Sequence, residues 1–382
     1  MPNAKNSICF INPDTIFKNI GGAEVQTFIL AYEAAQRGWN VYYVTKHDQV
    51  DYEQNGNIHF IPFEETGNIE RDKKTFMQLL GVIDADVYYQ RGRKLWTYYT
   101  GEYSKKARKP FIFATSMDID CYKNKKVFRY TNTYKDIIAS VYHAGTAMKI
   151  DRYTLRGMKS ASLVLSQTGK QKELLARNLS IQSAVFSNIH PVPSDIPEKS
   201  NPPVVLWLAN LKEWKQPEVF LEMARSLKDL DCQFILAGRL IDSHYKNLID
   251  ATTREVSNFR YIENVSFEKS NELIASSGLF VNTSRMEEGF PNTFIQAWMR
   301  RTPTITLHFD PDGVIEREGL GAKADSYIRL CDLVTKYVEN RSLRDTVGER
   351  AHIYATAVYG VEQNADKFFS LITRKKRYIK RL

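Results

Sequence analysis

The chain has 382 residues, of which 43% are hydrophobic and 25% are charged, and its formal net charge at pH 7 is +9. This composition, without a low-complexity tract, excludes a largely disordered protein, and the length favours two domains of about 190 residues each. Four cysteines lie far apart without a Cys-x-x-Cys pair, which excludes a disulfide framework and favours a reducing compartment.

No apolar run reaches the roughly 20 residues that a membrane-spanning helix needs, and no signal peptide precedes the first predicted strand. We therefore expect a cytoplasmic protein. The last twelve residues carry six basic side chains and no acid, which could hold the protein on the anionic inner face of a membrane or could simply form a solvated terminus. These six are Arg374, Lys375, Lys376, Arg377, Lys380 and Arg381. No arrangement of basic and aromatic residues resembles a nucleic-acid module, so no nucleic-acid partner is expected.

The first half of the chain predicts a parallel α/β domain over residues 1–190. Ser7 to Asn12 forms a strand in this prediction, Gln26 to Arg37 has the periodicity of a helix, and Asn40 to Thr45 is the next strand, which makes one βαβ unit. Four further apolar runs predict strands. They are His59 to Pro62, Val87 to Gln90, Pro110 to Ala114 and Leu163 to Ser166.

Five prolines among polar residues, between Ser187 and Pro203, predict an extended linker over residues 191–203. The alternation then restarts and predicts a second Rossmann-like domain over residues 204–355, followed by a C-terminal helix and basic tail over 356–382. Its expected elements are strands at Val204 to Ala209, Gln233 to Ala237, Arg260 to Ile262, Leu279 to Asn282 and Pro303 to Leu307, and helices at Glu218 to Leu227, from Asn292 and from Tyr327. Two such domains would place the carboxyl ends of two sheets along one cleft, where α/β proteins bind ligands.

Gly21-Gly22-Ala23-Glu24 lies between the first predicted strand and the first helix. Backbone without side chains can approach a ligand there, and the N–H groups of a helix start can face a phosphate. A plain turn before a helix explains the same residues. No Gly-x-Gly-x-x-Gly occurs at this turn, so a dinucleotide site of that type is not indicated.

Two segments of the second domain carry residues suited to a phosphorylated sugar. Lys215 follows the first strand of this domain, where its ammonium could pair with a diphosphate; an exposed loop lysine is the alternative. The segment from Glu288 to Thr293 comes between a strand and a helix. Gly289 permits close approach, the amides after Pro291 lie at the helix start, and the carboxylate of Glu288 could hold sugar hydroxyls.

The segment from Glu288 to Ala297 resembles the Glu-x7-Glu signature of the retaining glycosyltransferases of family 4, with its usual Glu-Gly-Phe opening. The resemblance covers nearly the whole chain. It also rests on Gly21 to Glu24, Tyr88 to Arg91, Trp214 to Pro217 and Asp310 to Gly313. It implies the GT-B fold: two facing Rossmann-like domains, with the acceptor side on the first, the donor side on the second and the donor site in the cleft between them.

The resemblance further implies a nucleotide-diphosphate sugar as donor substrate, and neither a metal ion nor another cofactor. Glu288 and Lys215 would be catalytic, with Glu288 at the sugar hydroxyls and Lys215 at the diphosphate, and Gln296 would bind the ribose. The remaining donor-binding residues would be Gly21, Gly22, Asn210, Val265, Gly289, Phe290, Pro291, Asn292 and Thr293. The reaction would keep the anomeric configuration, with the acceptor hydroxyl attacking on the leaving-group face.

Three positions differ from the family's pattern. Gln296 replaces the second glutamate, although its amide oxygen can still accept a hydrogen bond. Asn210 stands where an arginine usually accompanies the lysine, and Met117 lies close to where many relatives carry a histidine.

Asp118-Ile119-Asp120 has the spacing of the metal-binding Asp-x-Asp of the other large glycosyltransferase fold. The same spacing recurs three more times in the chain, and the seven histidines show no metal-ligand spacing, so the pattern does not indicate a metal site. We expect Asp118 to border the acceptor or sugar pocket; a helix N-cap is the alternative.

The sequence thus predicts a transferase that moves a sugar to a glycan or lipid-linked acceptor in the synthesis of a surface polysaccharide or glycolipid. A sugar-nucleotide epimerase or phosphorylase of the same architecture is a second interpretation. A non-catalytic partner that binds a sugar nucleotide is a third, because of the changes at Asn210 and Gln296.

Overall fold

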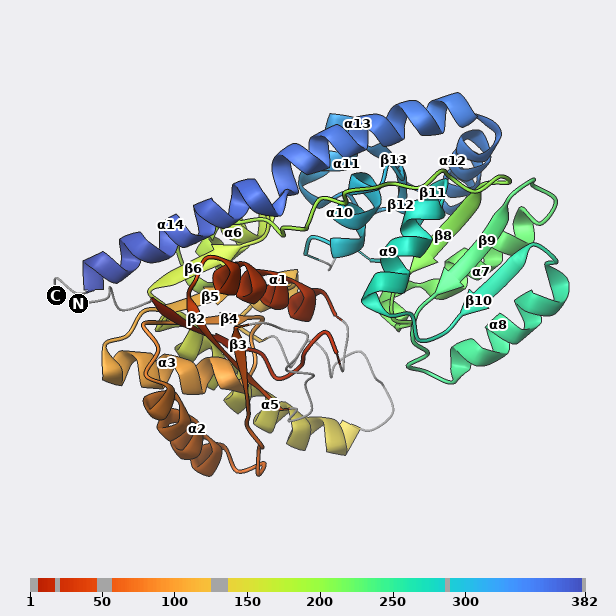
Figure 1. Ribbon diagram of the computed structural model, residues 1–382. Coiled ribbons are helices and arrows are strands. Elements are labelled where there is room, and N and C mark those ends of the chain that lie inside the picture. The colour runs from red at the N-terminus through yellow and green to blue at the C-terminus, as the bar shows by residue number, and fades with distance from the viewer. Residues whose placement is uncertain (1–5, 18–20, 47–56, 125–136, 286–288, 380–382) are drawn as a thin grey trace. The chain divides into compact units, whose positions relative to one another are not determined.

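The computed structural model describes residues 6–17, 21–46, 57–124, 137–285 and 289–379 (Figure 1). The chain forms two compact units. Unit 1 comprises residues 1–188 and 364–382, and unit 2 comprises residues 189–363. The segment 191–203, predicted as a linker, is therefore part of unit 2, and so is the beginning of the predicted C-terminal segment, from 356 to 363.

Unit 1 contains a sheet of seven parallel strands within the described residues, in the order β3-β2-β1-β4-β5-β6-β7. The strands are β3 (Ile58–Pro62), β2 (Asn40–Thr45), β1 (Ser7–Ile11), β4 (Val87–Arg91), β5 (Phe111–Ala114), β6 (Leu163–Ser166) and β7 (Ala184–Val185). The helices are α1 (Gly22–Gln36), α2 (Ile69–Ile83), α3 (Leu95–Ala107), the 3-10 helix η2 (Asp118–Cys121), α5 (Ile137–Lys159) and α6 (Gly169–Leu179). Helix α1 lies on one face of the sheet, and α2 and α3 lie on the other (Figure 1).

Unit 2 contains a sheet of six parallel strands in the described part of the chain, in the order β10-β9-β8-β11-β12-β13. The strands are β10 (Phe259–Ile262), β9 (Gln233–Ala237), β8 (Val204–Leu208), β11 (Leu279–Asn282), β12 (Thr304–Leu307) and β13 (Gly321–Ala324). The helices are η3 (Glu213–Lys215), α7 (Pro217–Ser226), α8 (His244–Glu255), α9 (Phe267–Ser276), α10 (Asn292–Met299), η4 (Pro311–Gly313), α11 (Val314–Glu318), α12 (Tyr327–Glu339) and α13 (Arg341–Tyr359). Helix α14 (Val361–Ile379) follows, and from Asn364 onward it belongs to unit 1.

The inner strands β1, β4, β5, β8 and β11 are buried on both faces and mostly apolar, as is typical of parallel sheets with helices on both faces. In β8 every residue is buried: Val205 and Trp207 face the core beneath α7, α8 and α12, whereas Leu206 and Leu208 face the core beneath α9, α10, α11 and α13. Full burial of one such side chain stabilises the fold by about 1.5–3 kcal/mol.

The predicted fold class, two parallel α/β domains, is confirmed. Each strand predicted from the sequence is present within one residue at either end. Strands β7 and β13 were not predicted, because a strand of two residues and a strand of sequence Gly-Ala-Lys-Ala carry almost no apolar pattern.

In each sheet, the strands that follow the first one in the chain are placed on one side of it, and the later strands are placed on its other side. In unit 1 this switch point lies between β1 and β4, and in unit 2 between β8 and β11. Open α/β sheets bind ligands outside the carboxyl ends of the strands at this position. A ligand site is therefore expected at the loops after β1, β4, β8 and β11.

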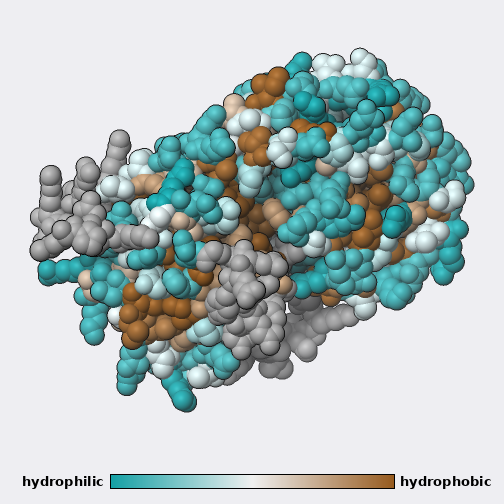
Figure 2. Space-filling view, viewed as in Figure 1, coloured by the Kyte–Doolittle hydropathy of each residue, from teal (hydrophilic) through white to brown (hydrophobic). Residues whose placement is uncertain are grey.

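Among the described helices, none is both long and apolar enough to cross a membrane. Hydrophilic residues prevail on the face shown in Figure 2. Arg374 to Arg377 fall in α14, whereas Lys380 and Arg381 lie outside the described residues. Membrane contact through this tail and a cytoplasmic location stay predictions.

Candidate functional site

The loops after β8 and β11 are joined by side-chain hydrogen bonds at the switch point of unit 2. The hydroxyl of Thr283 lies 2.8 Å from the carbonyl oxygens of both Lys215 and Gln216, and it accepts a hydrogen bond of 2.9 Å from Nε1 of Trp207. The backbone N–H of Arg285 donates to the carbonyl oxygen of Trp214 at 3.0 Å. Lys215 is thereby fixed next to the loop that leads to Glu288.

Lys215 ends η3 and is half-buried, with its Nζ 4.3 Å from the ring centroid of Trp214. Burial and, to a smaller extent, the neighbouring charge of Lys212 together lower the pKa of Lys215 to about 7. The indole face favours the charged ammonium, since a cation is attracted to the aromatic quadrupole. A dianionic diphosphate would favour the ammonium much more strongly.

The segment from Gly289 to Thr293 starts α10 after the loop of β11. Pro291 is the N-cap and has no side-chain oxygen, so no side chain of the cap residue occupies the amides of the helix start. The ring of Phe290 is buried and packs on Tyr359, with centroids 5.3 Å apart. Phe290 therefore anchors the segment to the core, and only its backbone is suited to a ligand. Glu288 lies outside the described residues.

Asn292, the first residue of α10, is held by a residue that the sequence did not single out. Nε2 of His190 lies 3.3 Å from Oδ1 of Asn292. Burial lowers the pKa of His190 to about 4, so the ring is neutral and its Nε2–H donates to the amide oxygen. The backbone of His190 also pairs with Tyr359 and Val361. No local motif marks this contact, because 102 residues separate its partners.

Gln296 lies one turn further along α10 and is 4% exposed. Its Nε2 donates to Oδ1 of Asn271 on α9 at 3.0 Å. Val265 lies in the loop between β10 and α9, where its side chain packs against the core and Ser266 caps α9. The family resemblance implies that Val265 and Gln296 contact the nucleotide. In the structure Val265 lies just before α9 and Gln296 lies on α10, and α9 and α10 pack together in unit 2.

Asn210 follows β8 and is half-buried. Its backbone is closely approached by Gly238, the first residue after β9. A methyl group at Gly238, whose φ is +143°, would lie 1.8 Å from the carbonyl oxygen of Ala209. The sequence did not single out Gly238, because an isolated glycine after a strand is common.

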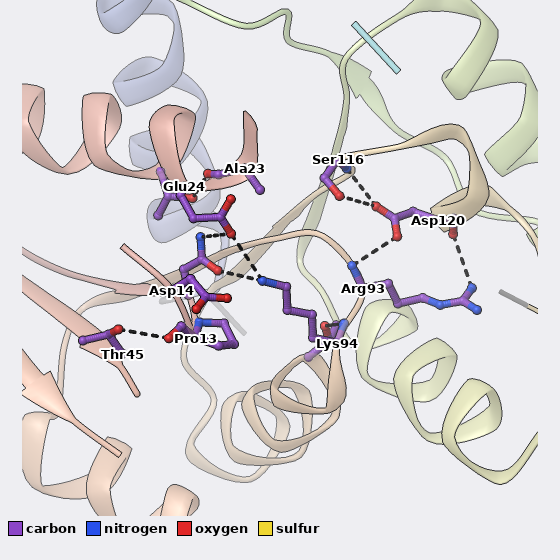
Figure 3. Close-up of polar contacts among 12 residues, drawn as sticks. Pro13, Asp14, Ala23, Glu24, Thr45, Arg93, Lys94, Ser116 and Asp120 are labelled. Atoms are coloured by element: carbon purple, nitrogen blue, oxygen red, sulfur yellow. Dashed lines mark hydrogen bonds and ion pairs between the residues drawn. The ribbon is translucent and has the colours of Figure 1, made fainter. Parts of the chain in front are cut away.

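In unit 1, Gly21 is the N-cap of α1 and has no side-chain cap, and Gly22 is exposed at its first position. A polar group faces this turn at the switch point (Figure 3). Nζ of Lys94, after β4, donates to Oδ1 of Asn12 at 2.9 Å and lies 3.5 Å from Oε1 of Glu24, to which Nδ2 of Asn12 donates at 3.3 Å. Lys94 was not singled out from the sequence.

Asp118 and Asp120 are both engaged within unit 1. The carboxylate of Asp118 accepts from Nζ of Lys170 at 2.6 Å and from Nε2 of Gln171 at 3.0 Å. That of Asp120 accepts from the backbone N–H of Ser116 at 2.8 Å and from that of Arg93 at 3.3 Å (Figure 3). Asp118 thus holds η2 to α6, and it is 5% exposed. Among the described residues, no group of three or more His, Cys, Asp or Glu side chains could hold a metal ion.

The comparisons with known proteins concern the family of one segment and the fold of the chain. Residues 202–340 match the family model described as "Glycosyl transferases group 1", a range that lies within unit 2 and contains Lys215 and α10. A search of curated proteins finds no match. Solved structures match nearly the whole chain. HepE (Alr3699) of Anabaena, in complex with UDP-glucose, is 15% identical, with 96% of this chain and 99% of that chain covered and a TM-score of 0.72.

The chain has the fold of GT-B glycosyltransferases. A mutant of S. aureus TarM in complex with Fondaparinux, alpha-GlcNAc-glycerol and UDP is 12% identical, with 96% of this chain and 99% of that chain covered and a TM-score of 0.71. WaaG, a glycosyltransferase involved in lipopolysaccharide biosynthesis, is 16% identical over 94% of this chain and 98% of its own, with a TM-score of 0.69. At these identities the GT-B likeness concerns the fold, and the group 1 match adds family evidence for unit 2.

Proposed function

We propose that this GT-B protein is a retaining glycosyltransferase that moves a sugar from a nucleotide-diphosphate sugar to a glycan or lipid-linked acceptor. The observation that carries the proposal is the arrangement at the switch point of unit 2. There the hydroxyl of Thr283, after β11, lies 2.8 Å from the carbonyl oxygen of Lys215. The N-cap residue of the following helix α10, Pro291, contributes no side-chain cap, and both segments lie within the range that matches the group 1 model. A cation and helix-start amides suit the two phosphates of such a donor.

We propose a role for each residue of the site. Lys215 and the amides of α10 would hold the diphosphate, Glu288 the sugar hydroxyls and Gln296 the ribose. When the glycosidic bond breaks, negative charge develops on the leaving diphosphate, so a preorganised cation there lowers the barrier. The acceptor hydroxyl would attack on the face that the diphosphate leaves and would pass its proton to the diphosphate. A surface polysaccharide or glycolipid is the product class we propose, and acceptor binding would fall to unit 1.

A panel of sugar nucleotides is expected to raise the unfolding temperature for at least one donor. A ligand at about 100 times its dissociation constant stabilises the folded protein by roughly 2.7 kcal/mol. The stabilising donor is then incubated with and without glycan and lipid-linked acceptors, and the anomeric configuration of the product is read by NMR. A product of retained configuration, formed only with acceptor, is the expected result.

Other outcomes point to the other interpretations. An altered sugar formed without an acceptor would indicate an epimerase, and sugar phosphate formed with inorganic phosphate a phosphorylase. Tight binding without turnover across the acceptors would indicate a non-catalytic partner. If no sugar nucleotide shifts the unfolding temperature, the donor site has been misassigned.

Turnover is expected to continue in excess EDTA. The reason is that Lys215 and the start of α10 supply positive charge to the diphosphate, a task that a divalent ion performs in other transferases. Initial rates are compared with and without chelator after dialysis. Complete loss of the rate, restored by magnesium or manganese, would contradict this part of the proposal.

A further inference from the structure

Gln296 and Asn271 form an amide pair between α10 and α9. Nε2 of Gln296 donates to Oδ1 of Asn271 at 3.0 Å, and the backbone oxygen of Gln296 accepts from Nη1 of Arg300 at 3.3 Å. Gln296 is buried, whereas Asn271 is half-buried. No partner of the Gln296 Oε1 atom is found among the described residues.

The direction of this hydrogen bond decides what Gln296 can offer to a ligand. A glutamate accepts at both oxygens, so either oxygen serves a ribose hydroxyl. A glutamine accepts at one end and donates at the other, and the two ends differ by a rotation of its amide. The hydrogen bond from one N–H of Nε2 to Asn271 fixes the rotation of the amide, with Nε2 toward α9 and the acceptor Oε1 at the opposite end, where a ligand hydroxyl can donate to it.

Asn271 itself sits on a well-defined helix. Its helix begins at the N-cap Ser266, whose hydroxyl accepts from the backbone N–H of Lys269 at 3.1 Å. Buried Leu273 and Ile274 on the same helix pack into the core that contains Phe294 and Ala297 of α10. The amide oxygen of Asn271 is therefore presented to α10 from a fixed position.

We propose that Asn271 is a positioning residue for the ribose of the nucleotide. It orients the amide of Gln296 so that Oε1 accepts a hydrogen bond from a ribose hydroxyl, the task that a carboxylate performs without orientation. This inference rests on the proposed function, because it takes the ribose role of Gln296 as given. It adds a residue of α9 to the determinants of nucleotide binding.

The hydrogen bond between Gln296 and Asn271 predicts different effects for single and double substitutions. Asn271→Asp keeps an acceptor for Nε2 of Gln296. Gln296→Glu is tolerated as well, because the amide of Asn271 can rotate and donate its Nδ2. The two substitutions together set two carboxylates at hydrogen-bond distance with no proton between them, which is unfavourable.

The test measures the preference for ribose in the full-length protein. The probe is whichever of UDP, GDP and ADP binds the wild type most tightly, together with its 2′,3′-dideoxy analogue, and dissociation constants are measured by calorimetry. Asn271→Ala is expected to weaken the diphosphate about fivefold to tenfold and to leave the dideoxy analogue within about twofold of wild type. Each conservative variant should stay within about threefold, and the double variant should lose at least about tenfold.

Glu272→Ala is the matched control, since Glu272 is the next residue of α9 and pairs with Lys269 on the exposed surface. It should change neither constant. Two results would overturn the inference: an equal loss of affinity for the diphosphate and its dideoxy analogue in Asn271→Ala, or a double variant that binds the diphosphate as tightly as the single variants. In either case, binding by the wild type would leave the proposed function intact. Failure of the wild type to bind any of the three diphosphates would instead overturn the proposed function, and this inference with it.

Discussion

Replacing Lys215 with methionine is expected to weaken the binding of a nucleotide-diphosphate sugar by about 1.5–3 kcal/mol, or roughly 10-fold to 150-fold. Methionine keeps an unbranched stem beside Trp214 but removes the charge. The ammonium is the group that we assign to the diphosphate, so its loss should leave the protein folded and the ligand weakly held. The dissociation constant is measured by calorimetry, with the unfolding temperature as the control for folding.

The same lysine should make donor binding depend on pH. Burial lowers the pKa of Lys215 to about 7 in the free protein, and a bound diphosphate raises it again by favouring the ammonium. Binding above pH 7 then takes up a proton, and the affinity should fall as pH rises, by up to about tenfold per pH unit. A nucleotide sugar suits this measurement because its diphosphate has no terminal phosphate that titrates near pH 6.

Lys215→Arg is the control variant for the pH dependence, because it keeps a positive charge that does not titrate in this range. The guanidinium stays charged across this range, so the affinity of this variant should be almost independent of pH between 6 and 9. If the wild type and Lys215→Arg show the same flat profile, or if Lys215→Met binds the donor as tightly as the wild type, Lys215 does not contact the diphosphate.

Replacing Gly238 with alanine is expected to destabilise the protein by more than about 3 kcal/mol. The added methyl group would meet the carbonyl oxygen of Ala209 at 1.8 Å, and the φ of +143° is itself unfavourable for a residue with a Cβ. A backbone atom cannot move aside as a flexible side chain can. At roughly 2–4 °C per kcal/mol for a domain of this size, the unfolding temperature should fall by about 6 °C or more.

Gly313→Ala in the same unit is the matched control. Its φ is +67°, and a methyl group there would have no heavy atom within 4 Å. It should cost only about 1–2 kcal/mol, the usual penalty of the left-handed region. Equal shifts for the two variants would show that φ alone matters and that the close approach of the loops after β8 and β9 is not rigid.

The place of Lys215 in the fold was predictable because strand ends are local features of the sequence. Apolar runs such as Val204 to Leu208 and Leu279 to Asn282 mark buried parallel strands, and the residues that follow them, Lys215 among them, must lie near the carboxyl edge of the sheet. The short strands β7 and β13 were not predicted, because they carry too little local apolar pattern.

The sequence by itself determined the α/β class, most of the strands and which loops carry candidate residues, because hydrophobic periodicity acts over a few neighbouring positions. Only the tertiary structure decided which side chains meet: Thr283 with the carbonyl of Lys215, His190 with Asn292, and Gln296 with Asn271. The ion pair between Asp118 and Lys170 is likewise visible only in the tertiary structure. Contacts between residues 25 to 102 positions apart depend on how helices and loops pack, and no local code specifies them.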